Sequence, residues 1–325
     1  MKREDLRIVF MGTPEFAVET LKTLVENHYP VVAVVTQPDK PVGRHGSVLQ
    51  PSAVKQYALS QEIPVLQPEK MKDEAFLEQL RSYQANLQVV VAFRMLPEVV
   101  WAMPEYGTFN VHAALLPQYR GAAPINWAII NGETQTGVTT FFLDHDIDTG
   151  RMILQKPFAI PDDADVEYVY EGLMHLGAEA ALETIEKMLD GEGRVASVPQ
   201  NEVVLPQGTE LHHAPKIFKE TCEICWDRPV KEIYDFIRGL SPIPGAWTLL
   251  QDSEGKETVL KIYRATKTTL KADEPGRIIA ERKQLYISAK DYLLQLDEVQ
   301  MAGKKRMNAT DFLNGNKNIE TYIIK

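Results

Sequence analysis

The chain has 325 residues, of which 44% are hydrophobic and 25% are charged, and its formal net charge is -10. This composition is typical of a soluble globular protein, and the length suits two domains. No run of about eighteen apolar residues predicts a membrane helix, and two cysteines argue against a disulfide scaffold. The apolar run after Leu6 is too short for a signal-peptide core, so we expect a cytoplasmic protein without a membrane partner.

Apolar strands and amphipathic helices alternate through the first 110 residues. The predicted strands are residues 6–12, 31–37, 87–93 and 107–112, and residues 64–68 are either a short strand or a turn. The predicted helices are residues 14–27, 52–61 and 72–83, with Thr13 as the N-cap of the first and Pro14 in its first turn. Strands that are apolar on both faces and alternate with helices predict an α/β fold with a doubly wound, mostly parallel sheet.

Two further strands and a long helix complete this part of the chain. Residues 136–146 and 151–160 predict neighbouring strands, and residues 166–189 predict one helix that Gly191 ends. Residues 192–215 show no periodicity and are interpreted as a linker. We therefore predict a first domain at 1–191 and a second at 216–325.

The last 110 residues have a different pattern. One helix near residues 230–238 precedes short strands separated by turn signals, which indicates a small β-barrel of the OB-like kind. PIPGAWTLL (242–250) follows the helix, and the short strands are predicted at residues 257–265, 276–282, 284–289 and 292–300. From Glu210 onwards the chain has 19 basic and 17 acidic residues, whereas the preceding part has 16 and 28. The acidity is thus confined to the N-terminal part, and a basic face is compatible with the C-terminal part.

The segment that carries the most chemistry lies between residues 110 and 150. Asn110 and His112 alternate at the end of a predicted strand, so they point to the same side of the sheet. Ligands of open α/β sheets bind at the carboxyl ends of strands, and Asp148 follows a neighbouring strand. Taken alone, an Asn and a His at a strand end are more often structural, and Asp-Thr-Gly is usually a turn.

The combination of motifs resembles the folate-dependent formyltransferases. The resemblance lies in Asn110-x-His112, the Leu-Leu-Pro-x-x-Arg-Gly loop at 115–121 and the Asp-Thr-Gly at 148–150. It extends over essentially the whole chain, through MGTPEFA, TQPDKPVGR, RGAAPINWAIINGET, the linker and APKIFKE. Within this superfamily the sequence is most similar to the branch that formylates the methionine of charged initiator tRNA, the methionyl-tRNA formyltransferases.

The resemblance implies a transfer of the formyl group of 10-formyltetrahydrofolate to an α-amine, by Asn110, His112 and Asp148. Free α-amines titrate near pH 7.7–8.0, so the nucleophile is partly neutral at cellular pH and needs no metal. Asn110 would stabilise the oxyanion, and His112 would complete that pocket. Asp148 would orient His112 and relay the proton through a water molecule. We expect a monomer.

The same resemblance implies a folate site, from which the chain departs at two places. Ala114 stands where the family usually has serine, and Phe93-Arg94 replace the common Tyr-Gly and shorten the segment before the following proline. Arg94 is compatible with the folate glutamate tail or with a solvated side chain. The implied folate-binding residues are Ala114, Leu115, Leu116, Pro117, Phe93, Arg94 and Asp144.

Two basic segments are implied to contact the tRNA. The proline-rich segment 37–52 contains Lys40 and Arg44, and in the family it reaches the acceptor end. The lysines that often follow the arginine are replaced here by His45, Gly46 and Ser47, which weakens the expected electrostatic contact. Near the C-terminus, Lys304, Lys305 and Arg306 form a basic run suited to a phosphate backbone, although such runs are often only solvated.

Several alternatives compete with this hypothesis. The run Asp144-His145-Asp146 has the residue types of a metal site, but the resemblance implies that its backbone lines the pteridine pocket while its side chains face water. The Cys222-x-x-Cys225 pair would need two more ligands for zinc, and only His212 and His213 are candidates. A nicotinamide enzyme is disfavoured because the first turn, MGTPEF, lacks G-x-G-x-x-G. A sugar-nucleotide formyltransferase would share the Asn-His-Asp set and the folate donor. A catalytically inactive tRNA-binding module would not be expected to keep all three residues.

Overall fold

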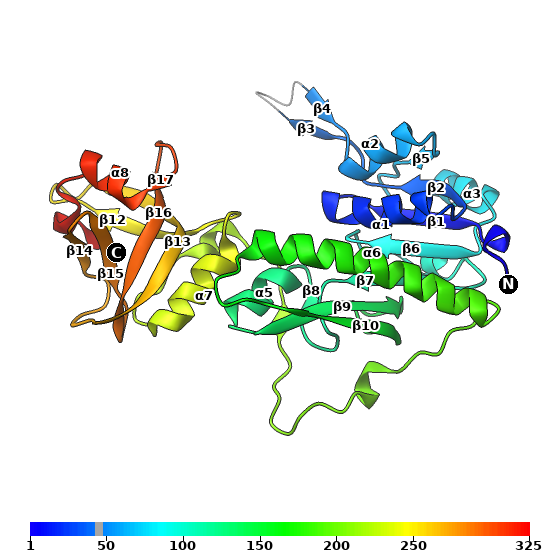
Figure 1. The fold of residues 1–325 in the computed structure, drawn as a ribbon. Helices are drawn as coiled ribbons and strands as arrows, with labels where there is room; N and C mark the ends of the chain where they lie inside the picture. Colours follow the sequence, from blue (N-terminus) through cyan, green and yellow to red (C-terminus); the bar gives the residue numbers. More distant parts are fainter. Residues whose placement is uncertain (43–47) are drawn as a thin grey trace. The chain divides into compact units, whose positions relative to one another are not determined.

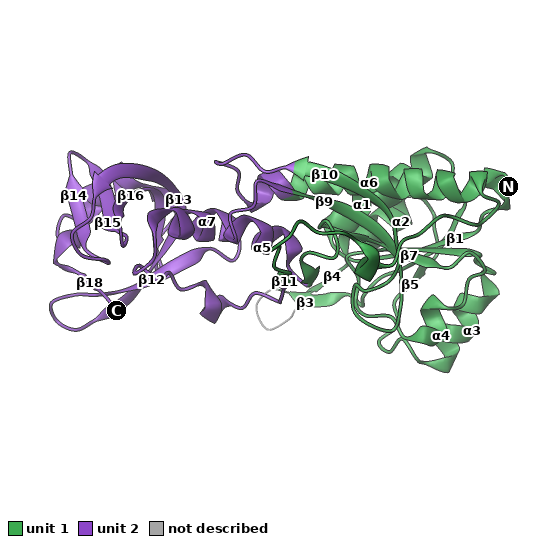
Figure 2. Ribbon diagram, turned by 90° about the horizontal axis from the view of Figure 1, so that it is seen from below, with its two compact units in different colours: residues 1–121, 136–158, 170–213 green, residues 122–135, 159–169, 214–325 purple. Residues whose placement is uncertain are grey.

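The computed structural model describes residues 1–42 and 48–325. The chain forms two compact units, each assembled from segments that are not contiguous in sequence (Figure 2). Unit 1 comprises Met1–Gly121, Thr136–Phe158 and Tyr170–His213, and unit 2 comprises Ala122–Gln135, Ala159–Val169 and Ala214–Lys325. The predicted domains 1–191 and 216–325 stay a prediction, because packing units and functional domains need not share boundaries.

Unit 1 is built on a seven-stranded sheet (Figure 1). In spatial order the strands are β10 (Met152–Ala159), β9 (Gln135–Phe142), β7 (Thr108–His112), β6 (Leu87–Val91), β1 (Ile8–Gly12), β2 (Val31–Val35) and β5 (Val65–Leu66). The pairs β1–β2, β1–β6, β2–β5 and β6–β7 are parallel, whereas β9 is antiparallel to β7. The predicted mostly parallel sheet is therefore confirmed.

Helices cover both faces of this sheet, as a doubly wound fold requires. On one face, β1, β2 and β6 share an apolar cluster with α3 (Glu74–Ser82) and the short α4 (Glu98–Trp101). On the other face, α6 (Val166–Asp190) packs on β7 and β9, where Thr184 Oγ1 lies 2.7 Å from Thr140 Oγ1. The remaining helices of the unit are α1 (Glu15–Glu26), α2 (Ala53–Ser60), η1 (Arg3–Asp5) and η3 (Gln200–Glu202).

The turn after β1 shows why the MGTPEF segment needs its glycine. A Cβ at Gly12 would lie 2.6 Å from the Cβ of Ala17, so only glycine allows α1 to start so close to the strand. The N-cap of α1 is Pro14 and not Thr13 as predicted. The Thr13 hydroxyl instead accepts a hydrogen bond from the backbone N–H of Gln37 at 3.4 Å, which ties this turn to the segment after β2.

The segment predicted as a linker is irregular, but its first half is fastened to unit 1. Val198 forms an isolated β-bridge with Met152, with two backbone hydrogen bonds of 2.8 Å. The Arg151 guanidinium donates to the Ser197 hydroxyl at 2.9 Å and to the Ser197 carbonyl at 2.6 Å. Residues near 197–202 therefore belong to the wall of unit 1.

Unit 2 contains a second, antiparallel sheet. Its strands in spatial order are β14 (Ile278–Glu281), β15 (Gln284–Ser288), β16 (Tyr292–Met301), β13 (Glu257–Lys271), β12 (Ala246–Gln251) and β18 (Ile323–Ile324), and β17 (Met307–Asn308) pairs with β16. The register between β13 and β16 shifts at three places, and such bulges bend a sheet. The sheet curls into a half-barrel (Figure 1), which confirms the predicted small β domain.

The core of unit 2 lies between this sheet and α7 (Val230–Leu240), with α8 (Ala309–Gly315), η4 (Lys219–Cys222) and η5 (Ile319–Thr321) at its edges. The helix α5 (Pro124–Ile130) packs on α7, and a Cβ at Gly239 would lie only 2.6 Å from Ile130 Cγ1. A buried ion pair joins Arg238 Nε to Asp235 Oδ1 at 2.8 Å, and Arg238 also donates to the Ala164 carbonyl. The RGAAPINWAII motif thus contributes a helix to unit 2.

Candidate active site

The first two predicted catalytic residues lie on β7, near the middle of the sheet. In the register of β7, Asn110 pairs with Val90 of β6 and Phe141 of β9, and His112 is the last residue of the strand. Asn110 is half-buried, and within residues 1–42 and 48–325 its side-chain amide has no hydrogen-bond partner. An amide that the fold does not use for its own stability is available to a bound molecule.

His112 is buried, with 6% of its surface exposed, and its ring is held by the backbone. Its Nε2 lies 2.9 Å from the carbonyl oxygen of Tyr119. Because a carbonyl only accepts, Nε2 carries the proton, and Nδ1 is the nitrogen that faces Asp148. The Phe141 ring lies edge-on to the imidazole, with ring centroids 6.4 Å apart.

Asp148 follows β9, and the structure brings its carboxylate towards His112. Asp148 Oδ2 lies 3.9 Å from His112 Nδ1, which is close enough for an ion pair but too long for a hydrogen bond. The same oxygen accepts the backbone N–H of Gly121 at 3.0 Å. The backbone of Asp148 has φ 56°, in the left-handed region that non-glycine residues seldom adopt. The geometry therefore brings Asp148 to His112, and Asn110 lies two residues before His112 on β7, on the same side of the strand.

The Asp-Thr-Gly turn needs its glycine because the chain passes very close to β9. A Cβ at Gly150 would lie 1.6 Å from the Phe142 carbonyl oxygen, which no side chain could tolerate. The Phe142 N–H donates to the Arg151 carbonyl at 3.0 Å across the same turn. The close return of the chain two residues later thus limits where Asp148 can lie.

The predicted folate loop, Ala114 to Pro117, is anchored by two side chains from the neighbouring strands. The Thr139 hydroxyl donates to the Ala114 carbonyl at 2.7 Å and accepts the Leu116 N–H at 3.0 Å. The Gln155 amide donates to the Leu116 carbonyl at 2.8 Å. Ala114, Leu116 and Pro117 are buried and Leu115 is half-buried. The loop's polar backbone groups thus serve its own anchoring, and its role towards folate stays a prediction.

The other predicted folate residues lie at the rim after β6 and β9. Phe93 packs partly against the apolar cluster of β1, β2 and β6. The Arg94 guanidinium donates to the Pro68 and Glu69 carbonyls, and burial lowers its pKa. Its Nε–H is buried without a partner in the part of the chain that the structure describes. Asp144 is exposed and its Oδ1 accepts the His145 N–H. Arg94 is therefore held by the backbone and is not a solvated side chain.

The segment implied to reach tRNA contains a short hairpin, which projects from unit 1 (Figure 1). Its strands are β3 (Lys40–Val42) and β4 (Val48–Gln50), and Lys40 is exposed. At its base, Asp39 forms an ion pair with Lys55 at 2.7 Å, and hydrogen bonds from Lys55 and Gln67 lower the pKa of Asp39. Arg44 lies outside the described residues.

In the C-terminal basic run, Arg306 forms an ion pair, whereas Lys304 and Lys305 are exposed. Arg306 donates to both carboxylate oxygens of Glu298 at 2.7 and 2.6 Å, and its guanidinium lies 4.3 Å from the centre of the Tyr263 ring. The hydrogen bond from Arg306 lowers the pKa of Glu298. Lys304 and Lys305 are exposed. The two lysines are thus better placed than Arg306 to meet a polyanion.

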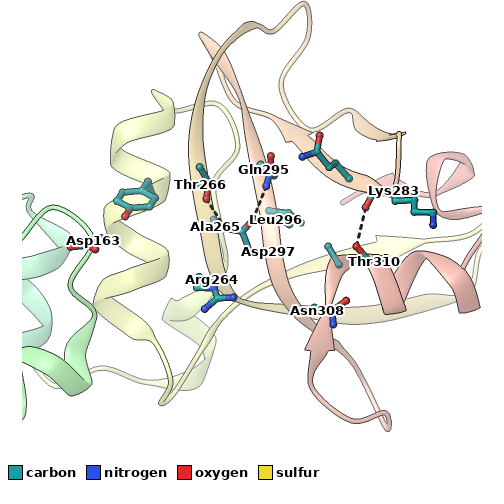
Figure 3. A pocket seen from close by; sticks show the side chains of 13 residues that line it. Asp163, Arg264, Ala265, Thr266, Lys283, Gln295, Leu296, Asp297, Asn308 and Thr310 are labelled. Carbon is teal, nitrogen blue, oxygen red and sulfur yellow. Dashed lines mark hydrogen bonds between the residues drawn. The ribbon is translucent and has the colours of Figure 1, made fainter.

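A groove of about 760 Å³ lies on unit 2, between β13, β16 and the start of α8 (Figure 3). Its charges are mixed, since Arg264 and Lys283 line it together with Asp163 and Asp297. The Asp297 carboxylate accepts hydrogen bonds from Thr266 at 2.7 Å and from Gln295 at 2.8 Å. Because charges of both signs line the groove, it does not indicate a ligand of one charge.

Within residues 1–42 and 48–325, no three His, Cys, Asp or Glu side chains are grouped so that they could hold a metal ion. Cys222 is buried, Cys225 is exposed, and neither forms a disulfide. Of the helices in the described ranges, none has the length and apolar character needed to span a membrane.

Comparison with known families decides the assignment. A family model described as formyl transferase matches residues 6–185, and the model of the formyl transferase C-terminal domain matches residues 216–317. The chain belongs to the formyl transferase family. The family inferred from the sequence motifs is thereby confirmed.

Curated relatives of this formyltransferase are similar over their full length. The chain is 61% identical to the methionyl-tRNA formyltransferase of Parabacteroides distasonis over 326 positions, which cover 100% of both chains. It is 59% identical to the methionyl-tRNA formyltransferase of Phocaeicola vulgatus over 317 positions, which cover 97% of each.

Solved structures share the fold of this formyltransferase at low identity. HypX from Aquifex aeolicus, solved with tetrahydrofolic acid, gives a TM-score of 0.63 at 19% identity, covering 97% of this chain and 48% of HypX. The chain thus spans about half the length of HypX. The sugar 3N-formyltransferase WlaRD gives 0.62 at 17% identity, covering 92% of this chain and 99% of WlaRD.

Sequence reasoning missed four residues that support the site of this formyltransferase. Tyr119 holds His112 through its carbonyl, Thr139 and Gln155 anchor the folate loop, and Gln200 lies behind the Asp148 turn. Thr139 pairs with His112 in the β7–β9 register, so the strand pairing could have indicated it. Tyr119 and Gln200 act from irregular segments, where no periodic signal exists.

Proposed function

We propose that this formyltransferase transfers the formyl group of 10-formyltetrahydrofolate to the α-amino group of methionyl-initiator tRNA. The observation that carries the proposal is the approach of the Asp148 carboxylate to His112 at the carboxyl end of β7, with Asn110 two residues earlier on the same strand. The acceptor is supported by full-length relatives at 61% and 59% identity that are named methionyl-tRNA formyltransferases. Such a reaction belongs in the cytoplasm, where initiator tRNA is charged and used.

The residues fit a formyl donor because they offer an unpaired amide beside a fixed imidazole. Folate would supply an activated formyl carbon, held near Phe93, Arg94, Asp144 and the 114–117 loop. The Asn110 amide is free to donate to the formyl oxygen as negative charge develops there. Donors of this kind contribute about 2.7–4 kcal/mol in other acyl-transfer enzymes.

His112 and Asp148 have different roles in proton transfer. Since Nε2 is committed to the Tyr119 carbonyl, a proton gained by His112 must sit on Nδ1, which faces Asp148. Asp148 Oδ2 is held by the Gly121 N–H, which leaves Oδ1 to accept a proton from the attacking amine, directly or through water. The same proton would then pass to the folate nitrogen as its bond to the formyl carbon breaks. General acid–base help of this type contributes about 10²–10⁴-fold.

A formylation assay tests the proposal. Purified protein with 10-formyltetrahydrofolate is expected to formylate methionyl-initiator tRNA and to leave uncharged tRNA unchanged. A dTDP-linked amino sugar serves as the competing acceptor. Activity on the amino sugar alone would refute the tRNA acceptor while keeping the formyl donor, and activity on neither would refute both.

Lys304 and Lys305 provide a prediction for the tRNA contact. Replacing both by alanine is expected to raise KM for the tRNA about tenfold and to reduce the slope of log KM against log salt by about 2, with kcat unchanged. Lys256→Ala, an exposed lysine in the β12–β13 turn, is the control for loss of charge and should change neither quantity. Equal effects of both variants, or an unchanged salt slope, would count against the contact.

A further inference from the structure

The Gln200 side chain makes four hydrogen bonds behind the Asp148 turn. Gln200 is 5% exposed and lies in the segment that the sequence predicts as a linker. Its Oε1 accepts from Arg120 Nε at 2.9 Å and from Arg120 Nη2 at 2.6 Å. Its Nε2 donates to the Asp148 carbonyl at 2.8 Å and to the Gly150 carbonyl at 2.9 Å. The amide thus joins three parts of unit 1 that are distant in sequence.

The chemistry of these partners fixes the orientation of the Gln200 amide. A guanidinium has only donors and a carbonyl has only acceptor lone pairs. Turning the amide over would place its NH₂ group against Arg120 and its oxygen against two carbonyls, and all four hydrogen bonds would be lost. Only a primary amide at this length satisfies both sides at once, so neither a carboxylate nor an apolar side chain can replace it.

The backbone conformation of Asp148 shows what the hydrogen bonds from Gln200 stabilise. With φ 56°, Asp148 is in the left-handed region, which few L-residues adopt, although aspartate enters it more readily than most, and its neighbours hold it there. Gln200 holds the carbonyl of this residue, while the Gly121 N–H holds its carboxylate. Released from Gln200, the backbone can return to the common region of φ, which rotates the side chain away from His112.

We infer that Gln200 is a positioning residue for formyl transfer: it holds Asp148 in the left-handed conformation that directs the carboxylate at His112. Gln200 acts through Asp148 and contacts no reacting atom. The predicted linker therefore contributes one side chain, Gln200, to the positioning of Asp148. This inference deepens the proposed function and rests on it, because it needs Asp148 to take part in the transfer.

Two substitutions separate the two sides of the amide. Gln200→Glu keeps an acceptor for Arg120 but places a second oxygen against the carbonyls of Asp148 and Gly150. Gln200→Met has a side chain of nearly the same length and removes the hydrogen bonds to both sides. Both variants are expected to lower kcat about 10²-fold, the cost of a small misplacement of a reacting group. KM for folate and for the acceptor should stay within about twofold, which a loss of fold would not produce.

Arg151→Ala is the matched control. It frees Ser197, three residues before Gln200, without touching the Gln200 amide, and should keep kcat within about twofold of the unchanged protein. Thermal unfolding of all variants shows whether each is folded at the assay temperature. Three results would each overturn the inference: an unchanged kcat in Gln200→Glu or Gln200→Met, a rise in KM at constant kcat, or an equal loss in Arg151→Ala.

The choice of acceptor keeps the two proposals distinguishable. If the unchanged protein formylates an amino sugar and not methionyl-tRNA, the acceptor proposal fails, and the same variants are compared on the amino sugar. A 10²-fold loss of kcat there would still support the role of Gln200. Full activity of the Gln200 variants on methionyl-tRNA would leave the proposed function standing and reject the positioning role.

Discussion

Asp148→Asn is expected to lower kcat for formyl transfer by about 10²–10⁴-fold while folate binds as before. The substitution keeps the size of the side chain, and its amide oxygen can still accept the Gly121 N–H. It removes the negative charge that faces His112 Nδ1 and the carboxylate oxygen that is proposed to take the proton. The check is a single-turnover formylation measured beside a folate-binding titration.

The variants around Asp148→Asn sharpen this test. His112→Ala is expected to lower kcat by a similar factor. The double variant should have about the kcat of the less active single variant, because the effects of residues that act as a unit do not add. Asp146→Asn, at an exposed carboxylate in the same loop, should keep its activity. If Asp148→Asn retained more than a tenth of the kcat, the proton role of Asp148 would be rejected.

Asn110→Ala is expected to lower kcat by about 10²–10³-fold, the usual cost of losing one oxyanion donor. Because the Asn110 amide has no partner within residues 1–42 and 48–325, its removal leaves no buried group unsatisfied. The free energy of unfolding should therefore change by less than about 0.5 kcal/mol. Denaturant unfolding and steady-state kinetics on the same preparation provide the comparison. A loss of stability that parallels the loss of activity would indicate a structural role instead.

Much of the fold of unit 1 could be predicted because its elements carry periodic signals. Buried strands alternate with amphipathic helices, and the observed β1, β2, β6 and β7 lie within the predicted ranges. The same alternation placed Asn110 and His112 on one side of a strand. Asp148 could not be placed by periodicity, because its distance to His112 depends on how a loop after β9 returns across the sheet edge.

The helix α5 and the basic run show two other limits of the sequence. PINWAII follows the loop of the catalytic motif, yet it packs on α7, because the apolar contact between Ile130 and Gly239 joins positions that are far apart in the chain. Arg306 stands in a basic run, but its charge is paired with Glu298, eight residues earlier. Neither contact leaves a local pattern in composition or spacing.

The bond between His112 and the Tyr119 carbonyl has a consequence for mutational tolerance. Since the acceptor belongs to the backbone, no side-chain replacement at 119 removes it directly. The imidazole needs from this position only a backbone that keeps φ near 58°. Glycine, asparagine and aspartate enter that region most easily, and β-branched residues resist it. The orientation of the His112 ring thus depends on the path of the backbone, so the backbone conformation at position 119 limits which residues can stand there.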